Sequence, residues 1–215
     1  AQGASNGTFR ESPVIIGGST FGVPGLIVGD ADTAVSLDGV NDYIDTNRVH
    51  NFAAGFTLIG SIKTADASFA ALYGDTQGTP DRGVQVYLDA AGHVLFDGFK
   101  GSPGTPCWSL ATAGVVNDDV VHTIVATWDG TGSAGAVVVY IDGAADANTA
   151  TAAGSGASVE GPYAFGFKTG IFGRLYNAGG VSLGEAFAGV GDEFMILDRG
   201  ITPVEAASVH TSATT

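Results

Sequence analysis

Acidic side chains are the most numerous groups able to do chemistry in this sequence, and SLDGVNDYIDT, residues 36–46, contains three of them. Asp38 precedes Gly39, and an Asp-Gly pair favours a tight turn because glycine readily takes a positive φ. The next residues alternate as in a strand, so Asp42 and Asp45 point to opposite faces. The three carboxylates therefore do not converge. Their spacing fits neither a catalytic pair nor an EF-hand loop, whose acidic ligands alternate before a glycine.

Carboxylate pairs for glycoside hydrolysis must flank the scissile bond, and one strand supplies such a pair when acids occupy alternate positions. Asp192 and Glu193 are adjacent instead, which would place them on opposite faces of a strand. The sequence has no His-x-x-x-His pair that would suggest a zinc site, although a Ser-His-Asp triad assembled only in space stays open. We therefore predict that the chain is not an enzyme.

Sugar recognition combines an aromatic platform with polar groups, and three segments contain both. Trp108 lies in GTPCWSL, where glycine and proline favour an exposed loop. Tyr73 and Asp75 lie in ALYGDTQ, and Tyr176 and Asn177 lie in RLYNAGG. These five residues are candidate glycan-binding residues. The simpler alternative is that the two tyrosines only end strands.

Composition excludes several partners. The 215 residues carry a formal net charge of −14 with only eight Lys and Arg, which opposes binding to a phosphate backbone, so we predict no nucleic-acid partner. No apolar run approaches the ~20 residues that span a bilayer, so we predict no membrane insertion. Cys107 is the only cysteine, which excludes an internal disulfide.

Short alternating segments separated by turn residues recur along the chain. Asp-Gly pairs at 38, 97, 129 and 142 predict turns, and 98–119 and 145–162 resemble long loops. A helix is predicted over 203–210, with Pro203 in its first turn. The pattern predicts an all-β fold, an antiparallel β-sandwich of the jelly-roll type with one short C-terminal helix, in a single domain over 1–215. The predicted strands lie within 56–63, 69–73, 84–97 with a turn at 89–92, 120–128, 136–141, 164–167, 170–174 and 190–197.

Several of these segments, in this order, resemble the laminin-G-like, concanavalin-A-like jelly-roll domains of bacteria and their phages. The matching segments are AVSLDGVNDYIDT, FTLIGSIKT, GVQVYLDAAGHVLF, VVHTIVATWDG, VVVYIDGA and GVGDEFMILDRGITPVEAASVH. The resemblance implies two curved antiparallel sheets whose concave face or rim loops often bind glycans. Relatives usually carry a further aromatic-rich strand before a segment like ASNGTF. We therefore expect that strand to come from a longer parent chain or from a partner.

The same resemblance implies one structural calcium ion. It points to Asp192 in GVGDEF as a contributing carboxylate, with Asp30 and Asp32 in VGDADT, or Asp42, near it. Calcium takes six to eight oxygens, many of them from backbone carbonyls, so its ligands need not form a compact motif. The alternative is that these acids are solvated turn residues.

The resulting hypothesis is a non-catalytic structural or attachment module of a phage virion, in a tail, fibre or capsid decoration, that also recognises host-surface glycans. Its partners would be other virion or surface proteins, its location the virion or the extracellular space, and assembly as a homo-oligomer stays open. The alternative is a carbohydrate-binding accessory domain of a secreted bacterial enzyme or adhesin. The fold is shared by all these classes, so fold alone does not choose between them.

Overall fold

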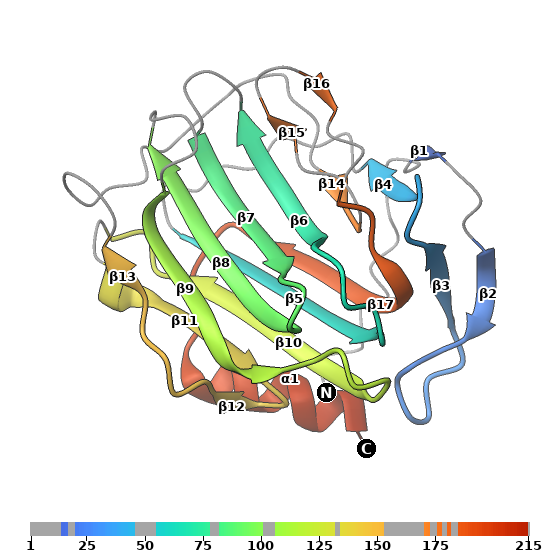
Figure 1. Ribbon diagram of the computed structural model, residues 1–215. Helices are drawn as coiled ribbons and strands as arrows, with labels where there is room; N and C mark the ends of the chain where they lie inside the picture. The colour runs from blue at the N-terminus through green and yellow to red at the C-terminus, as the bar shows by residue number, and fades with distance from the viewer. Residues whose placement is uncertain are drawn as a thin grey trace.

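Two antiparallel sheets packed face to face form the body of the molecule in the computed structural model (Figure 1). This arrangement confirms the predicted jelly-roll β-sandwich. The residues that the structure describes are 14–16, 20–45, 55–77, 82–100, 106–131, 134–152, 170–172, 176–177, 180–181 and 185–214.

The first sheet has eight strands and lies in front in Figure 1. Its strands, in spatial order, are β1 (Val14–Ile16), β4 (Tyr43–Asp45), β14 (Gly170–Ile171), β6 (Ala70–Gln77), β7 (Arg82–Leu88), β8 (His93–Lys100), β9 (Pro106–Val115) and β13 (Thr151–Ala152).

The second sheet has seven strands and lies behind the first. Its order is β12 (Ala144–Ala145), β11 (Val137–Ile141), β10 (Val121–Trp128), β5 (Phe56–Lys63), β17 (Ala188–Leu197), β3 (Thr33–Asp38) and β2 (Thr20–Pro24). A separate two-stranded ladder pairs β15 (Tyr176–Asn177) with β16 (Gly180–Val181), and a single 3₁₀ turn, η2 (Ala134–Ala136), precedes β11.

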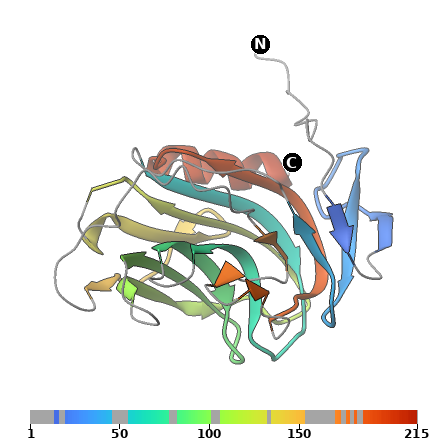
Figure 2. The ribbon, with the colours of Figure 1, turned by 90° about the horizontal axis from the view of Figure 1, so that it is seen from above.

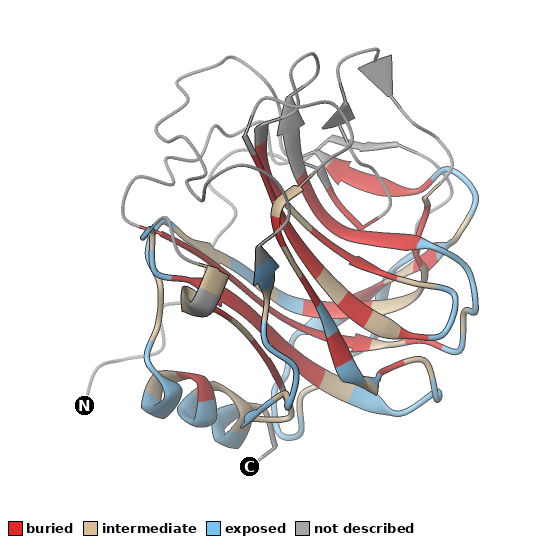
Figure 3. Cartoon of the chain, turned by 60° about the vertical axis from the view of Figure 1, so that its left-hand side comes forward, coloured by how far each residue is buried: buried red, intermediate tan, exposed pale blue. Residues whose placement is uncertain are grey.

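The core lies between the two sheets, and Figure 3 shows long buried stretches on their strands. Side chains point alternately to the two faces of a strand, and those that point between the sheets form the core. A run of aromatic side chains crosses it. The rings of Phe56 and Tyr73 have centroids 4.9 Å apart, those of Phe96 and Trp108 meet edge to face at 4.9 Å, and Trp108 lies 6.0 Å from Trp128. Aromatic pairs at these separations add to the free energy gained by burial. Because these side chains point inward, their strand neighbours must point outward.

The C-terminal helix α1 (Pro203–Thr214) covers the outer face of the seven-stranded sheet (Figure 2). Its buried Ala206 packs with Ile59, Val125 and Tyr140 of that sheet. A reciprocal capping box fixes its start, since the Glu205 amide donates to Thr202 Oγ1 at 3.3 Å and the Thr202 amide donates to Glu205 Oε2 at 2.8 Å. In the described part of the chain, no helix is long and apolar enough to cross a membrane.

Most predicted strands are confirmed. The prediction for 56–63 matches β5, and the segment 84–97 forms β7, a turn and β8. The segments 120–128, 136–141 and 190–197 correspond to β10, β11 and β17, 69–73 falls largely in β6, and the helix at 203–210 extends to residue 214. Part of the segment 170–174 forms β14, while 164–167 lies outside the described residues.

The predicted loop at 98–119 is wrong, because β8 continues to Lys100 and β9 occupies most of the remainder. In β9 the side chains of Trp108, Leu110 and Thr112 alternate inward into the core. The second predicted loop, 145–162, contains β13 at residues 151–152, and its residues from 153 lie outside the described ranges.

The Asp97-Gly98 pair forms no turn either, unlike the pairs at 38, 129 and 142, whose glycines take a positive φ. Gly98 lies inside β8, where a Cβ atom would come within 2.3 Å of the Trp108 indole. The glycine is therefore required by a ring that packs against its backbone.

Candidate functional site

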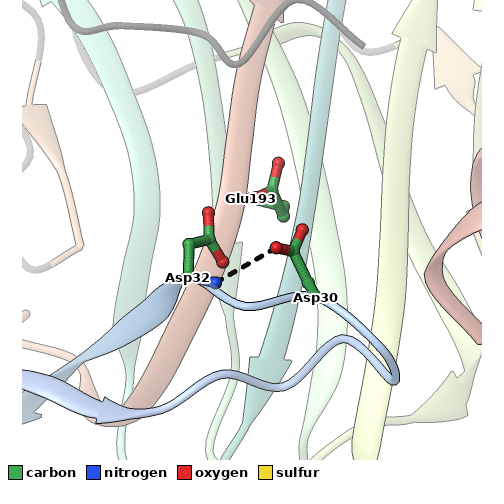
Figure 4. Close-up of side chains that lie close together, drawn as sticks. All are labelled: Asp30, Asp32 and Glu193. Atoms are coloured by element: carbon green, nitrogen blue, oxygen red, sulfur yellow. Dashed lines mark hydrogen bonds between the residues drawn. The ribbon is translucent and has the colours of Figure 1, made fainter.

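Three exposed carboxylates form a cluster beside the edge of the seven-stranded sheet. One carboxylate oxygen from each of Asp30, Asp32 and Glu193 lies within 4.8 Å of the other two. Figure 4 shows that the two aspartates come from the connection between β2 and β3, and that the glutamate comes from β17. We call these three residues the acidic triad.

Local backbone geometry brings the acidic triad together. The Asp32 amide donates to Asp30 Oδ1 at 3.1 Å, which shapes the loop as an Asx turn. On β17 the pairing with β5 shifts between Asp192 and Met195, so that two residues oppose one. Glu193 lies in this bulge with a φ of 51°, and the bulge turns its side chain toward the loop.

Asp192 holds the loop against β17 rather than joining the acidic triad. It is 7% exposed, its Oδ2 accepts a 2.7 Å hydrogen bond from the Leu26 amide, and its Oδ1 accepts one of 3.0 Å from the Glu193 amide. The sequence expectation placed Asp30 and Asp32 near Asp192. The structure places them against its neighbour Glu193, and it places Asp192 underneath as a support.

Asp42 lies apart from the acidic triad, so its predicted place near Asp192 is wrong. Its Oδ2 accepts a 2.9 Å hydrogen bond from the Asp38 amide, at the end of β3 that is distant from the Asp30–Asp32 loop. The turn that begins at Asp38 folds Asp42 back onto this end, where it is fully buried. A residue held there cannot share an ion with the other end of the strand.

Mutual repulsion shapes the electrostatics of the acidic triad. Burial, together with the hydrogen bond and charge of Asp32 and the charges of Asp192 and Asp30, raises the pKa of Glu193 to about 7. Oxygen ligands of this kind are those that hard cations such as calcium prefer, and a bound cation would remove the repulsion. The donor set therefore fits a calcium ion.

A second polar group lies on the outer face of the eight-stranded sheet. Because Val86 and Phe96 point into the core, Tyr87 and Asp97 point away from it. The Tyr87 hydroxyl donates a short hydrogen bond to Asp97 Oδ2. Glu185, whose carbonyl accepts a hydrogen bond from the Ala71 amide, adds its carboxyl group beside Tyr87.

An exposed aromatic ring completes this group. Phe69 is 41% exposed, and its ring centroid lies 4.7 Å from that of Tyr87. We call Phe69, Tyr87, Asp97 and Glu185 the outer-face site. Sequence reasoning missed it, because Asp97 was assigned to a turn and Phe69 was treated only as part of a strand. The strand alternation of HVLFD contained the signal that Asp97 faces outward.

Burial dominates the ionisation of the outer-face site. Asp97 is only 5% exposed, and this burial raises its pKa, an effect partly opposed by hydrogen bonding to Ser109 and Tyr87. Burial also raises the pKa of Glu185, and burial together with the negative charge of Asp97 raises that of Tyr87. Two oxygens, Asp97 Oδ1 and Glu185 Oε2, are buried without a hydrogen-bond partner among the described residues.

The glycan-binding residues predicted from the sequence do not form an exposed platform. The expectation for Trp108 is wrong, because its alternation in β9 buries the indole completely. Tyr73 is likewise buried, with its ring against Phe56 in the core. Asp75 lies on β6, and Tyr176 and Asn177 form β15, but the structure describes only the backbone of these three residues.

Comparisons with known proteins identify the fold but no family. No protein-family model matches the sequence, and no curated protein matches it. Among solved structures, a heptameric SAP-like pentraxin from Limulus polyphemus is 13% identical, with 82% of this chain and 81% of that chain covered and a TM-score of 0.56.

Two further solved structures contain bound sugars. The CBM40 domain of the Ruminococcus gnavus IT-sialidase, bound to alpha2,3 sialyllactose, has a TM-score of 0.60 and 15% identity over 82% of this chain and 96% of its own. Domain 4 of AbnA, a GH43 extracellular arabinanase from Geobacillus stearothermophilus, in complex with arabinotriose, has a TM-score of 0.57 and 14% identity over 90% and 82%. At such identities the likeness establishes a shared β-sandwich fold.

The raised pKa of Glu193 predicts a specific pH dependence of stability. Between the unperturbed pKa of 4.5 and about 7, the folded chain holds a proton that the unfolded chain has lost, so this residue makes stability fall as the pH rises through that window. In buffer with a metal chelator, the melting temperature of Glu193→Gln should fall less than that of the wild type as the pH rises from about 5 to 8.

Glu205→Gln is the control, because the pKa of Glu205 is shifted in the opposite direction. Hydrogen bonds from Arg199 and Thr202 lower this pKa to about 2. Glu205 contributes stability that is lost only as the pH falls toward that value, so its substitution should leave the change between pH 5 and 8 intact. Differential scanning calorimetry measures both variants. An equal pH slope in Glu193→Gln and the wild type would contradict the assignment.

Proposed function

We propose that this chain is a non-catalytic glycan-binding module. The observation that carries the proposal is the outer-face site, where the exposed Phe69 ring packs on Tyr87 and the Tyr87 hydroxyl donates a hydrogen bond to the buried Asp97. An exposed ring offers a platform for the C–H face of a sugar, and neighbouring polar groups bond its hydroxyls. The complexes of two similar folds with sialyllactose and arabinotriose support the proposal by analogy.

The burial of the carboxylates favours binding over hydrolysis. A glycosidase needs one carboxyl group to protonate the leaving oxygen and another to attack or to activate water, so both must reach the sugar. Asp97 is almost fully buried, and its Oδ2 is occupied by the Tyr87 hydroxyl. An occupied and buried carboxylate is suited to shaping the surface above it rather than to attacking a substrate.

We further propose that the acidic triad holds one structural calcium ion. Asp30, Asp32 and Glu193 would contribute carboxylate oxygens, and the ion would neutralise their repulsion. It would also tie the loop before β3 to β17, in parallel with the Asp192 to Leu26 hydrogen bond. This role is structural, because Glu193 lies on β17 of the seven-stranded sheet, whereas Tyr87 and Asp97 of the outer-face site lie on the eight-stranded sheet.

The setting we propose for this module is a phage virion, where it would serve attachment to the host surface. The acidic, cysteine-poor composition and the resemblance to phage and bacterial jelly-roll domains support this setting. The alternative setting is an accessory domain of a secreted bacterial enzyme or adhesin. Mass spectrometry of purified phage particles should detect the chain with the coat proteins. Its absence from particles, together with a covalently linked hydrolase or adhesin domain, would favour the alternative.

Removal of the aromatic platform should weaken sugar binding. Phe69→Ala should weaken binding to any glycan found on an array by roughly five- to thirtyfold, because stacking on one aromatic ring contributes roughly 1–2 kcal/mol. Phe21→Ala is the matched control, since Phe21 is 57% exposed on β2 of the other sheet. Isothermal titration calorimetry gives both affinities. If no glycan binds the wild type, the proposed function is wrong.

Calcium should raise the melting temperature by roughly 5–10 °C when its concentration is about a hundred times its Kd. Glu193→Gln and Asp32→Asn should each remove most of this increase, because each loses a charged ligand. Asp129→Asn, in the turn after β10, is the control for loss of one exposed charge, and it should retain the increase. A wild-type melting temperature that is the same with calcium and with chelator would overturn the calcium site.

A further inference from the structure

We propose that the outer-face site selects neutral glycans and rejects sialylated ones. The inference rests on the proposed glycan-binding function and names the class of sugar that the same site accepts. It follows from the two carboxylates next to Tyr87, whose ring packs on Phe69, from their oxygens without a hydrogen-bond partner and from the absence of a basic partner for either among the described residues.

The first argument concerns hydrogen bonding. Asp97 is 5% exposed, and its Oδ1 has no donor among the described residues, although its Oδ2 accepts from Tyr87. Glu185 Oε2 is likewise buried without a hydrogen-bond donor among the described residues. An ionised carboxylate only accepts hydrogen bonds. Because these oxygens are buried without a donor, their negative charge is not offset by hydrogen bonding, and the carboxylate of a sialic acid would add a further acceptor and a further negative charge nearby.

The second argument concerns charge. The charged groups that act on the Tyr87 hydroxyl are Asp97, Glu185 and Asp89, all of them acidic. Asp89 is paired with His93 at 2.9 Å, but in the described part of the chain Asp97 and Glu185 have no ion pair. Charges buried beneath a surface are screened less by salt than exposed ones. They therefore repel an anionic ligand at the neighbouring Phe69 and Tyr87 rings, and the net charge of −14 adds to this repulsion.

The third argument concerns position: the two carboxylates can discriminate between ligands by their charge without touching them. Asp97 is held on β8, where its register partners are Gln85 of β7 and Ser109 of β9, so three paired strands fix it in place. A rigid charge below the binding surface needs no direct contact with the ligand to exclude an anion. Phe69 would supply the affinity, and Asp97 with Glu185 would supply the selectivity.

The test compares matched sugars on matched variants. Lactose and alpha2,3 sialyllactose, which differ by the sialic acid, are titrated into the wild type, together with arabinotriose as a second neutral probe. The best neutral glycan from an array and its sialylated form make a further pair. The variants are Asp97→Asn and Glu185→Gln, which remove charge with little change in shape, and Asp129→Asn is the control for loss of an exposed charge on the other sheet.

We expect the wild type to bind the neutral member of a pair at least about tenfold more tightly than the sialylated member. Asp97→Asn and Glu185→Gln should each narrow this ratio, and Asp129→Asn should leave it unchanged. Equal or tighter binding of the sialylated member, or a ratio that neither substitution changes, would overturn the selectivity while leaving glycan binding intact. Failure of every neutral and sialylated glycan to bind the wild type would instead overturn the proposed function, and this inference with it.

Discussion

Packing of large aromatic side chains between the two sheets is the constraint on which the rest of the structure depends. Phe56, Tyr73, Phe96, Trp108 and Trp128 cross the core, and their size sets how closely the sheets approach. Since side chains alternate along a strand, an inward ring fixes the direction of the residue beside it. Phe96 faces inward, so Asp97 faces outward, and Gly98 gives the Trp108 ring its space. The outer-face site is a consequence of the core.

The bulge in β17 is a departure from this regularity, and it builds the other site. Glu193 and Phe194 together oppose Gly60, where a Cβ atom would come within 2.3 Å of the Phe194 ring. Phe194 packs on Phe172 with centroids 4.1 Å apart, which anchors the bulge from the core side. Glu193 is thereby exposed in a left-handed conformation, next to the Asp30–Asp32 loop. The free energy of a buried aromatic contact thus offsets the strain of a positive φ at a polar position.

Local alternation and turn chemistry were sufficient to predict most of the fold. The segment 56–63 shows this best, since its alternation and its β-branched residues predicted β5 to the residue. The predictions failed where a glycine could indicate either a loop or the close packing of a large side chain. Glycine and proline around 98–108 suggested a loop, but Gly98 is small because an indole packs on it, a fact that depends on a residue ten positions away. The same error assigned Trp108 to an exposed site and hid Asp97 in a turn.

The candidate sites were only half predictable, for a related reason. Asp30 and Asp32 were identified by their type, but Glu193 joined them through a bulge whose register shift depends on β5, and no spacing along the chain encodes that. Sequence alternation alone would have put Asp192 and Glu193 on opposite faces of a regular strand. Their burial does differ in that sense, with Asp192 buried and Glu193 exposed. Alternation could not predict which loop packs against Asp192 and Glu193.

The two acidic groups show how one chain of high negative charge can resolve repulsion in two physical ways. In the acidic triad the carboxylates are exposed and close together, so either a shared proton or a cation can relieve their repulsion; burial together with the neighbouring carboxylates raises the pKa of Glu193. In the outer-face site Asp97 is buried and Glu185 is half-buried, and the Tyr87 hydroxyl donates a hydrogen bond to Asp97. A solvated cation cannot readily reach such a place, whereas the charge still acts on a ligand at the surface. This difference in burial is why we propose a metal-binding role for the acidic triad and a ligand-selecting role for the outer-face site.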